Sequence, residues 1–116
     1  MNRLGVDAAI LHPRASFRYA QFAHQPPVVG FDSLRLAAND VLVLPEDLGP
    51  QHLDFAPRIR RIVFNQGVNN MFKKYSLMDD RPLVHQVESV LGCFAVSDQN
   101  ARYLRFAFPS LKVERL

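Results

Sequence analysis

Ile62-Val63-Phe64-Asn65-Gln66-Gly67 is the stretch that decides the fold, because three large apolar residues end abruptly in two amides and a glycine. A short apolar run bounded by turn residues is typical of a buried strand. In a parallel sheet, the carboxyl end of a strand points toward the crevice in which ligands bind. We therefore expect a central strand whose end carries Asn65 and Gln66 to a ligand-binding edge.

Two other stretches repeat this layout. Residues 41–46 (VLVLPE) form an apolar run that ends in a proline and a glutamate, and residues 94–98 (FAVSD) end in a serine and an aspartate. If all three runs are parallel strands, their carboxyl ends meet at the same edge of the sheet. The candidate binding residues are therefore Glu46, Asn65, Gln66, Ser97 and Asp98.

The rest of the chain alternates between strand and helix patterns. Ser97 can cap a helix in which Ala101, Leu104 and Phe108 recur at helical spacing. Shorter helical segments are expected after residue 49, from residue 69 or 70 to residue 75, and over residues 83–90. The expected strands cover residues 8–11, 41–44, 60–65, 91–96 and 111–116.

This alternation predicts the fold class. Strands that alternate with helices need crossover connections and therefore form a parallel sheet. The strands are apolar throughout, which is expected when helices cover both faces. The sequence thus predicts a Rossmann-like α/β fold, with a parallel sheet of about five strands and helices on both faces. At 116 residues, a single domain is expected.

Composition and charge narrow the class of protein. Hydrophobic residues make up 48% of the chain and charged residues 22%, as in an ordinary globular domain. The net charge of +3 is too small, and the basic residues are too scattered, to indicate a nucleic-acid partner. No run approaches the roughly 18 apolar residues of a membrane span. We therefore expect a protein that binds no nucleic acid and has no membrane span.

Cysteine usage indicates the compartment. Cys93 is the only cysteine, so the chain has no disulfide framework and a cytoplasmic location is expected. Because Cys93 falls inside a predicted strand, we expect a buried, inert thiol.

Each candidate residue allows two interpretations. Glu46 either accepts hydrogen bonds from a polyol or acts as a general base, or it is a loop acid that is solvated or caps the next helix. Asn65 and Gln66 either bind a hydroxyl-rich ligand or tie down the following loop. Ser97 and Asp98 either open a helix that receives an anion or simply cap that helix.

The sequence indicates no cofactor and no metal. The histidines at positions 12, 24, 52 and 85 have no metal-ligand spacing among themselves or with Cys93. The five glycines lie far apart and form neither a dinucleotide-binding nor an NTP-binding loop.

Taken together, the strand ends resemble a known family. Residues 40–46 (DVLVLPE), 61–66 (RIVFNQ) and 94–98 (FAVSD), the last followed by Tyr103-Leu104 and Phe108-Pro109, resemble the N-terminal domain of group 1, GT-B type glycosyltransferases. Residues 4–8 (LGVDA) also resemble the join between the first helix and second strand of that domain. The similarity covers most of residues 4–116 and depends on the order and spacing of short motifs.

The resemblance implies a function and a role for the candidate residues. The family transfers a sugar from a nucleotide-sugar to an acceptor, and its N-terminal domain mainly binds the acceptor. The resemblance therefore implies that Glu46, Asn65, Gln66, Ser97 and Asp98 line the acceptor side of a cleft, with Glu46 as the candidate catalytic residue. The implied ligand is a sugar or glycan acceptor.

The chain departs from the family at both ends. The first strand and Gly-rich loop of the family are not found before Arg3, and no donor-binding domain follows. The chain is thus expected to be most of one domain, completed by a homo-oligomer or by a partner that supplies the missing half. The alternative is a non-catalytic α/β module for binding or assembly, which self-associates or docks on a partner because an open sheet edge is seldom left uncovered.

Overall fold

The computed structural model describes residues 5–21, 23–49, 52–73 and 80–116. The chain divides into two compact units, Met1–Leu36 and Ala37–Leu116. The single domain expected from the length stays a prediction.

The first unit contains a small parallel sheet. Strand β1 (Ile10–His12) pairs with β2 (Val28–Gly30), and the 3-10 turn η1 (Phe31–Ser33) follows directly. The strand predicted over residues 8–11 therefore begins two residues later, at Ile10. The His12 ring stacks on the Phe17 ring at a centroid distance of 3.8 Å.

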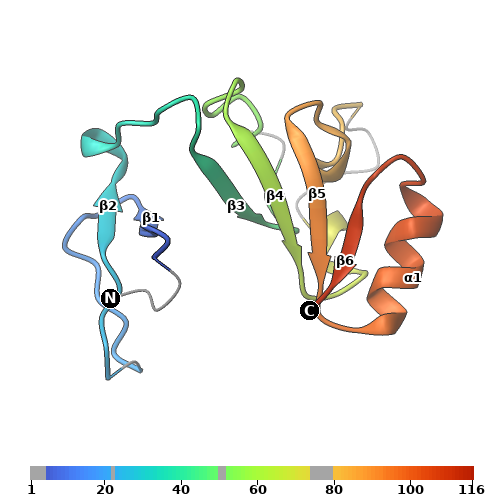
Figure 1. Ribbon diagram of the computed structural model, residues 1–116, viewed down its shortest axis with the longest axis horizontal. Helices are drawn as coiled ribbons and strands as arrows, with labels where there is room; N and C mark the ends of the chain where they lie inside the picture. The colour runs from blue at the N-terminus through green and yellow to red at the C-terminus, as the bar shows by residue number, and fades with distance from the viewer. Residues whose placement is uncertain (1–4, 22, 50–51, 74–79) are drawn as a thin grey trace. The chain divides into compact units, whose positions relative to one another are not determined.

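The second unit is built on a four-stranded parallel sheet. Its strands are β3 (Val41–Pro45), β4 (Arg60–Asn65), β5 (Val90–Ala95) and β6 (Val113–Arg115), and they lie in chain order across the sheet (Figure 1). The strands predicted from residues 41, 60, 91 and 111 are all present with small shifts at their ends. The predicted α/β class with parallel strands is confirmed.

One α-helix and two 3-10 turns connect these strands in the described part of this unit. Helix α1 (Asp98–Ala107) matches the predicted helix. The helices predicted over residues 69–75 and 83–90 are single turns instead, η3 (Asn70–Phe72) and η4 (Val84–Gln86). At η4 the turn ends because Val87 is extended and the chain enters β5 at Val90. Residues 74 and 75, and the start of the helix expected after residue 49, lie outside the described residues.

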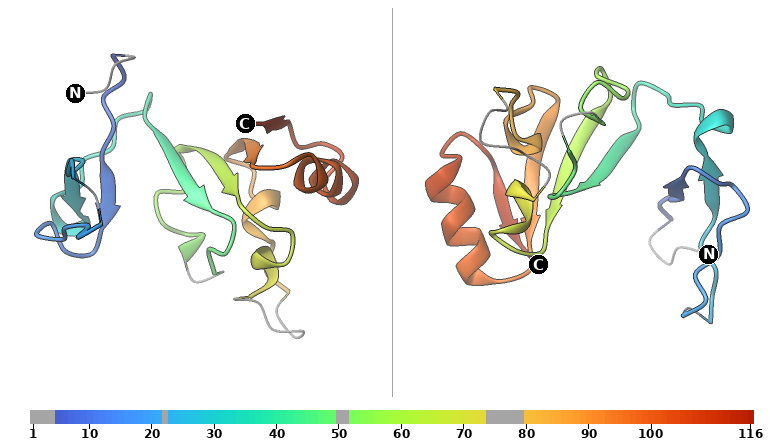
Figure 2. Two further views of the ribbon diagram at one scale, coloured as in Figure 1. Left: turned by 90° about the horizontal axis from the view of Figure 1, so that it is seen from below. Right: turned by 180° about the vertical axis from the view of Figure 1, so that it is seen from behind.

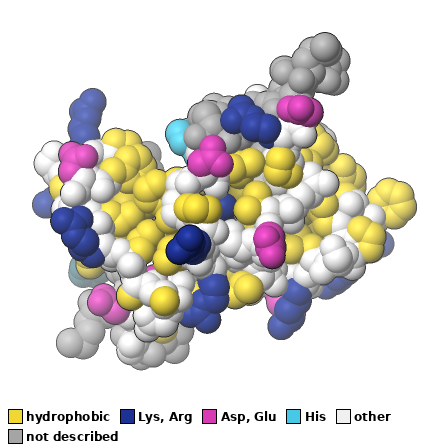
Figure 3. Space-filling view, turned by 90° about the horizontal axis from the view of Figure 1, so that it is seen from above, with side chains coloured by type: hydrophobic (Ala, Val, Ile, Leu, Met, Phe, Trp, Pro, Cys, Tyr) yellow, Lys and Arg dark blue, Asp and Glu magenta, His cyan; other side chains and the backbone are white. Residues whose placement is uncertain are grey.

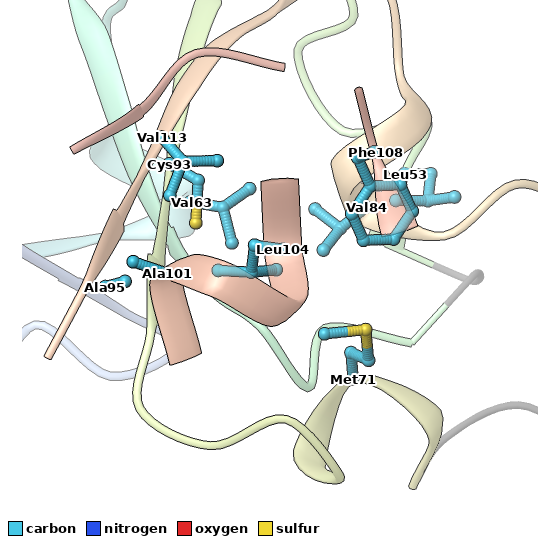
Figure 4. Close-up of a cluster of buried hydrophobic side chains, with 10 residues drawn as sticks. All are labelled: Leu53, Val63, Met71, Val84, Cys93, Ala95, Ala101, Leu104, Phe108 and Val113. Carbon is cyan, nitrogen blue, oxygen red and sulfur yellow. The ribbon is translucent and has the colours of Figure 1, made fainter. Parts of the chain in front are cut away.

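The strand order explains which face of the sheet is covered. Each connection leads to the next strand in the same direction across the sheet. Because crossovers between parallel strands are almost always right-handed, all of these connections cover the same face of the sheet. The sequence predicts helices on both faces, but α1, η3 and η4 all contribute to one buried cluster on one face (Figures 2 and 4). Within this cluster, Leu104 of α1 is central, between the strand residue Val63 and the η4 residue Val84 (Figure 4).

The other face of this sheet is apolar and partly exposed. Along β4, Arg61, Val63 and Asn65 are buried, whereas Ile62 and Phe64 are only half-buried. Val43 on β3 is 63% exposed and Leu91 on β5 is 53% exposed. Burial in β4 thus alternates with the two-residue period of a strand, and its buried side includes the polar Arg61 and Asn65.

Charged side chains are dispersed over the surface that Figure 3 shows. Lys and Arg side chains there are separated by hydrophobic and acidic ones (Figure 3). Among the described residues, no helix is long and apolar enough to cross a membrane.

Candidate functional site

A polar cleft of about 310 Å³ lies at the carboxyl ends of β4 and β5. The loop after β4 forms one wall, and the start of α1 forms the other. Of the described lining residues, every one except Gly67 and Val68 carries an amide or a hydroxyl, and none carries a charge. The lining residues are Gln66, Gly67, Val68, Asn69, Asn70, Ser97, Gln99 and Asn100.

Three of these amides are available to a ligand. Gln66 and Asn69 on the loop and Gln99 on α1 are exposed. Within the described part of the chain, their side chains make no hydrogen bond. Each carboxamide can donate and accept hydrogen bonds, so the cleft offers both functions to a bound molecule.

Glu46 holds the loop wall from behind. Its carboxylate is only 3% exposed. Its Oε1 accepts hydrogen bonds from the Gly67 backbone N–H at 3.1 Å and from Asn70 Nδ2 at 2.8 Å. Glu46 is therefore not the solvated loop acid that the sequence allowed, and its bonds show a carboxylate that fixes the loop after β4.

A buried amide network supports the cleft from below. Asn65 is fully buried, and its Nδ2 donates to Asn100 Oδ1 at 3.1 Å. Asn100 Nδ2 donates in turn to the Asn65 carbonyl at 3.0 Å. His85 Nε2 lies 2.9 Å from Asn65 Oδ1. Because Oδ1 only accepts, the His85 proton is on Nε2, and the network joins β4, η4 and α1.

His85 is uncharged in this network at neutral pH. Burial lowers the pKa of His85 to about 4, and the negative charge of Glu46 acts more weakly in the opposite direction. Its Nδ1 has no hydrogen-bond partner, and its ring stacks on Phe108 at 5.0 Å. Protonation would place an unpaired charge inside the core.

Cys93 is chemically quiet. It is 2% exposed, and burial raises its pKa to about 12, with a further contribution from the charge of Glu46. The thiol therefore stays protonated and is a poor nucleophile, in agreement with the sequence prediction.

Ser97 caps α1, and Asp98 is the first residue of that helix. Ser97 Oγ accepts a hydrogen bond from the Asn100 backbone N–H at 3.2 Å and also lines the cleft. Asp98 is exposed and pairs with Arg115 of β6 at 3.3 Å. The capping interpretation is thus supported for Ser97, which is also part of the cleft wall, whereas Asp98 only adds a negative charge to the first turn.

The five sequence-predicted residues therefore gather at one sheet edge in different roles. Gln66 and Ser97 line the cleft, Glu46 and Asn65 lie behind it, and Asp98 lies beside it. Sequence reasoning missed Asn69, Asn70, His85, Gln99 and Asn100. Asn100 could have been identified from the sequence, because it is a polar residue on the same buried helix face as Leu104.

Comparison of the chain with protein-family models, with curated proteins and with solved structures finds no match. Among the described residues, no group of three or more side chains could hold a metal ion.

Proposed function

We propose that this chain is the acceptor-binding part of a GT-B type glycosyltransferase, and that its cleft receives the hydroxyl groups of a sugar or glycan. The observation that carries the proposal is the convergence on one cleft of three carboxamides that make no hydrogen bond to any described residue. Carboxamides donate to and accept from hydroxyl groups, as sugar binding requires. The cleft volume of about 310 Å³ is at the lower end of small-molecule sites.

The resemblance of the strand ends to the glycosyltransferase N-terminal domain supports the same ligand class. In such a reaction this chain would orient the acceptor hydroxyl toward a nucleotide-sugar held by a second domain or a partner. The described residues of the cleft lining include no group that could act as a general base. Because Oε1 of Glu46 is bonded to the loop, we assign Glu46 to positioning rather than to proton transfer. The single, buried Cys93 supports a cytoplasmic location.

Saccharide titration tests the proposal. The wild-type chain is expected to bind a saccharide from a neutral mono- and disaccharide panel. Replacing Gln66, Asn69 and Gln99 by alanine should weaken that binding at least tenfold, since each lost hydrogen bond costs about 0.5–1.5 kcal/mol. Asn39→Ala removes an exposed amide elsewhere in the same unit and should leave affinity unchanged. The proposal fails if no saccharide binds, or if both variants behave alike.

The partly exposed sheet face favours the second candidate function, a non-catalytic module that self-associates. Ile62, Leu91 and Phe94 line a shallow hollow of about 190 Å³ together with Lys112 and Glu114. These two opposite charges lie 3.4 Å apart, so a second copy related by a two-fold axis could exchange the pair. The proposed occupant of this face is therefore a second copy of the chain.

Sedimentation analysis tests whether the chain self-associates. A dimer at micromolar concentration should dissociate in Leu91→Glu, because a charge on an apolar interface is costly. Phe106→Glu alters a side chain on α1 that is 85% exposed, and should leave the dimer intact. A monomeric wild-type chain contradicts self-association.

A further inference from the structure

We propose that Glu46 makes the cleft selective for uncharged saccharides over anionic ones. The inference rests on the proposed function and adds the chemical class of sugar that the site accepts. It assigns Glu46 a role as a specificity-determining residue, distinct from that of the amides that contact the ligand.

The position of the Glu46 charge is the first observation. The carboxylate oxygen Oε1 is one hydrogen bond away from Gly67 and from Asn70, and both residues line the cleft. The side chain is only 3% exposed, so water screens its charge poorly. An anionic group in the cleft would meet a like charge directly behind the wall.

Among the described residues that line or support the cleft, no positive charge offsets that of Glu46. The lining residues are neutral, and His85, which contacts the same support network, is uncharged at neutral pH. Arg61 is buried near the start of β4, where it donates to the carbonyls of Leu53 and Phe55. Lys73 is exposed and does not line the cleft.

Several backbone N–H groups near the cleft already have acceptors. Glu46 takes the Gly67 N–H, and Asn70 N–H donates to the Gly67 carbonyl. At the start of α1, the Asn100 and Ala101 N–H groups donate to Ser97, and Asp98 adds a negative charge. These four N–H groups are therefore not available to an anion.

These features favour neutral hydroxyls. A hydroxyl can bind the free carboxamides of Gln66, Asn69 and Gln99 without meeting a repulsive charge. A carboxylate or phosphate makes the same contacts but is repelled by the negative charge of Glu46 behind the cleft wall. We expect this repulsion to weaken binding about tenfold. A cationic sugar should bind at least as tightly as the neutral one.

Glucose, glucosamine and glucuronate give a matched neutral, cationic and anionic series for an NMR titration of the whole chain. In the wild type, glucuronate should bind about tenfold more weakly than glucose. In Glu46→Gln, glucose affinity should stay within about twofold, because one carboxamide oxygen can accept both hydrogen bonds that Oε1 accepts now. Glucuronate affinity should rise about tenfold, to that of glucose.

Glu88→Gln is the matched control, since it removes an exposed acid of the same unit that does not line the cleft. It should leave the glucose-to-glucuronate ratio unchanged. Equal binding of glucose and glucuronate by the wild type overturns the inference even if Glu46→Gln does not fold. An unchanged ratio in folded Glu46→Gln also overturns it and leaves the proposed function standing, whereas failure of every saccharide to bind overturns both.

Discussion

Asn65 and Gln66 are neighbours in the chain, yet they have different structural roles. Asn65 is fully buried and holds Asn100 and His85, whereas Gln66 is exposed on the cleft wall. Strand residues alternate between faces, so the last residue of β4 points into the core and the next leaves the sheet. Of these two amides at the strand end, Asn65 therefore stabilises the buried network and Gln66 faces the cleft.

Replacing Asn65 by alanine should destabilise the protein. The change leaves the His85 Nε2–H and the Asn100 carboxamide buried without their partner, at a cost of about 2–4 kcal/mol. Gln66→Ala should change stability by less than about 0.5 kcal/mol, because Gln66 is exposed. Urea denaturation measures both variants, and equal midpoints would contradict the network.

Acidification should destabilise the protein through His85. Its pKa is about 4 in the folded chain, below the ordinary value for histidine, so the unfolded chain takes up the proton first as the pH falls. Stability should therefore drop by about 2 kcal/mol between pH 7 and pH 5. In His85→Gln, which retains an N–H donor but does not titrate, this drop should be much smaller. A profile that is identical in both proteins would rule out this role for His85.

At the scale of elements, apolar runs and caps located β3, β4, β5 and α1 well. Each has its own local signal: a short apolar run with a polar stop, or a serine cap with helical spacing. The turns η3 and η4 lack such signals. The Asn65–Asn100 and Asn65–His85 bonds join residues 35 and 20 positions apart, so they depend on packing that no local pattern encodes.

Two glycines in these elements should respond differently to alanine. A Cβ at Gly92 of β5 would lie 2.8 Å from the Lys112 backbone oxygen, and backbone cannot move aside easily. Gly92→Ala should therefore cost about 1–3 kcal/mol. At Gly67 the nearest atom is the side-chain Nδ2 of Asn70, at 3.1 Å, which can shift.

Gly67→Ala should consequently affect stability less than Gly92→Ala does. Its main effect should be weaker saccharide binding, because the shift disturbs the Asn70 bond to Glu46. Thermal unfolding and titration of the two variants separate these effects. The reverse order of stabilities would contradict the described packing.

At the scale of the whole molecule, the sequence predicted a parallel sheet correctly but did not predict which faces of that sheet are covered. The apolar strands indicated a parallel sheet, and the same apolar content suggested two covered faces. Strand order decides the coverage, and order is a tertiary property: the sequential arrangement of β3 to β6 sends the connections to one face. The division into two compact units likewise has no composition signal at residue 36.

The central claim is that the amide-lined cleft binds a neutral saccharide. The most direct measurement follows side-chain NH₂ resonances during a titration with a saccharide that binds. The Gln66, Asn69 and Gln99 signals should shift together with one saturating affinity, while the Asn39 signal stays in place. No saturable shift at the three cleft amides, or an equal shift of the Asn39 signal, would contradict the account.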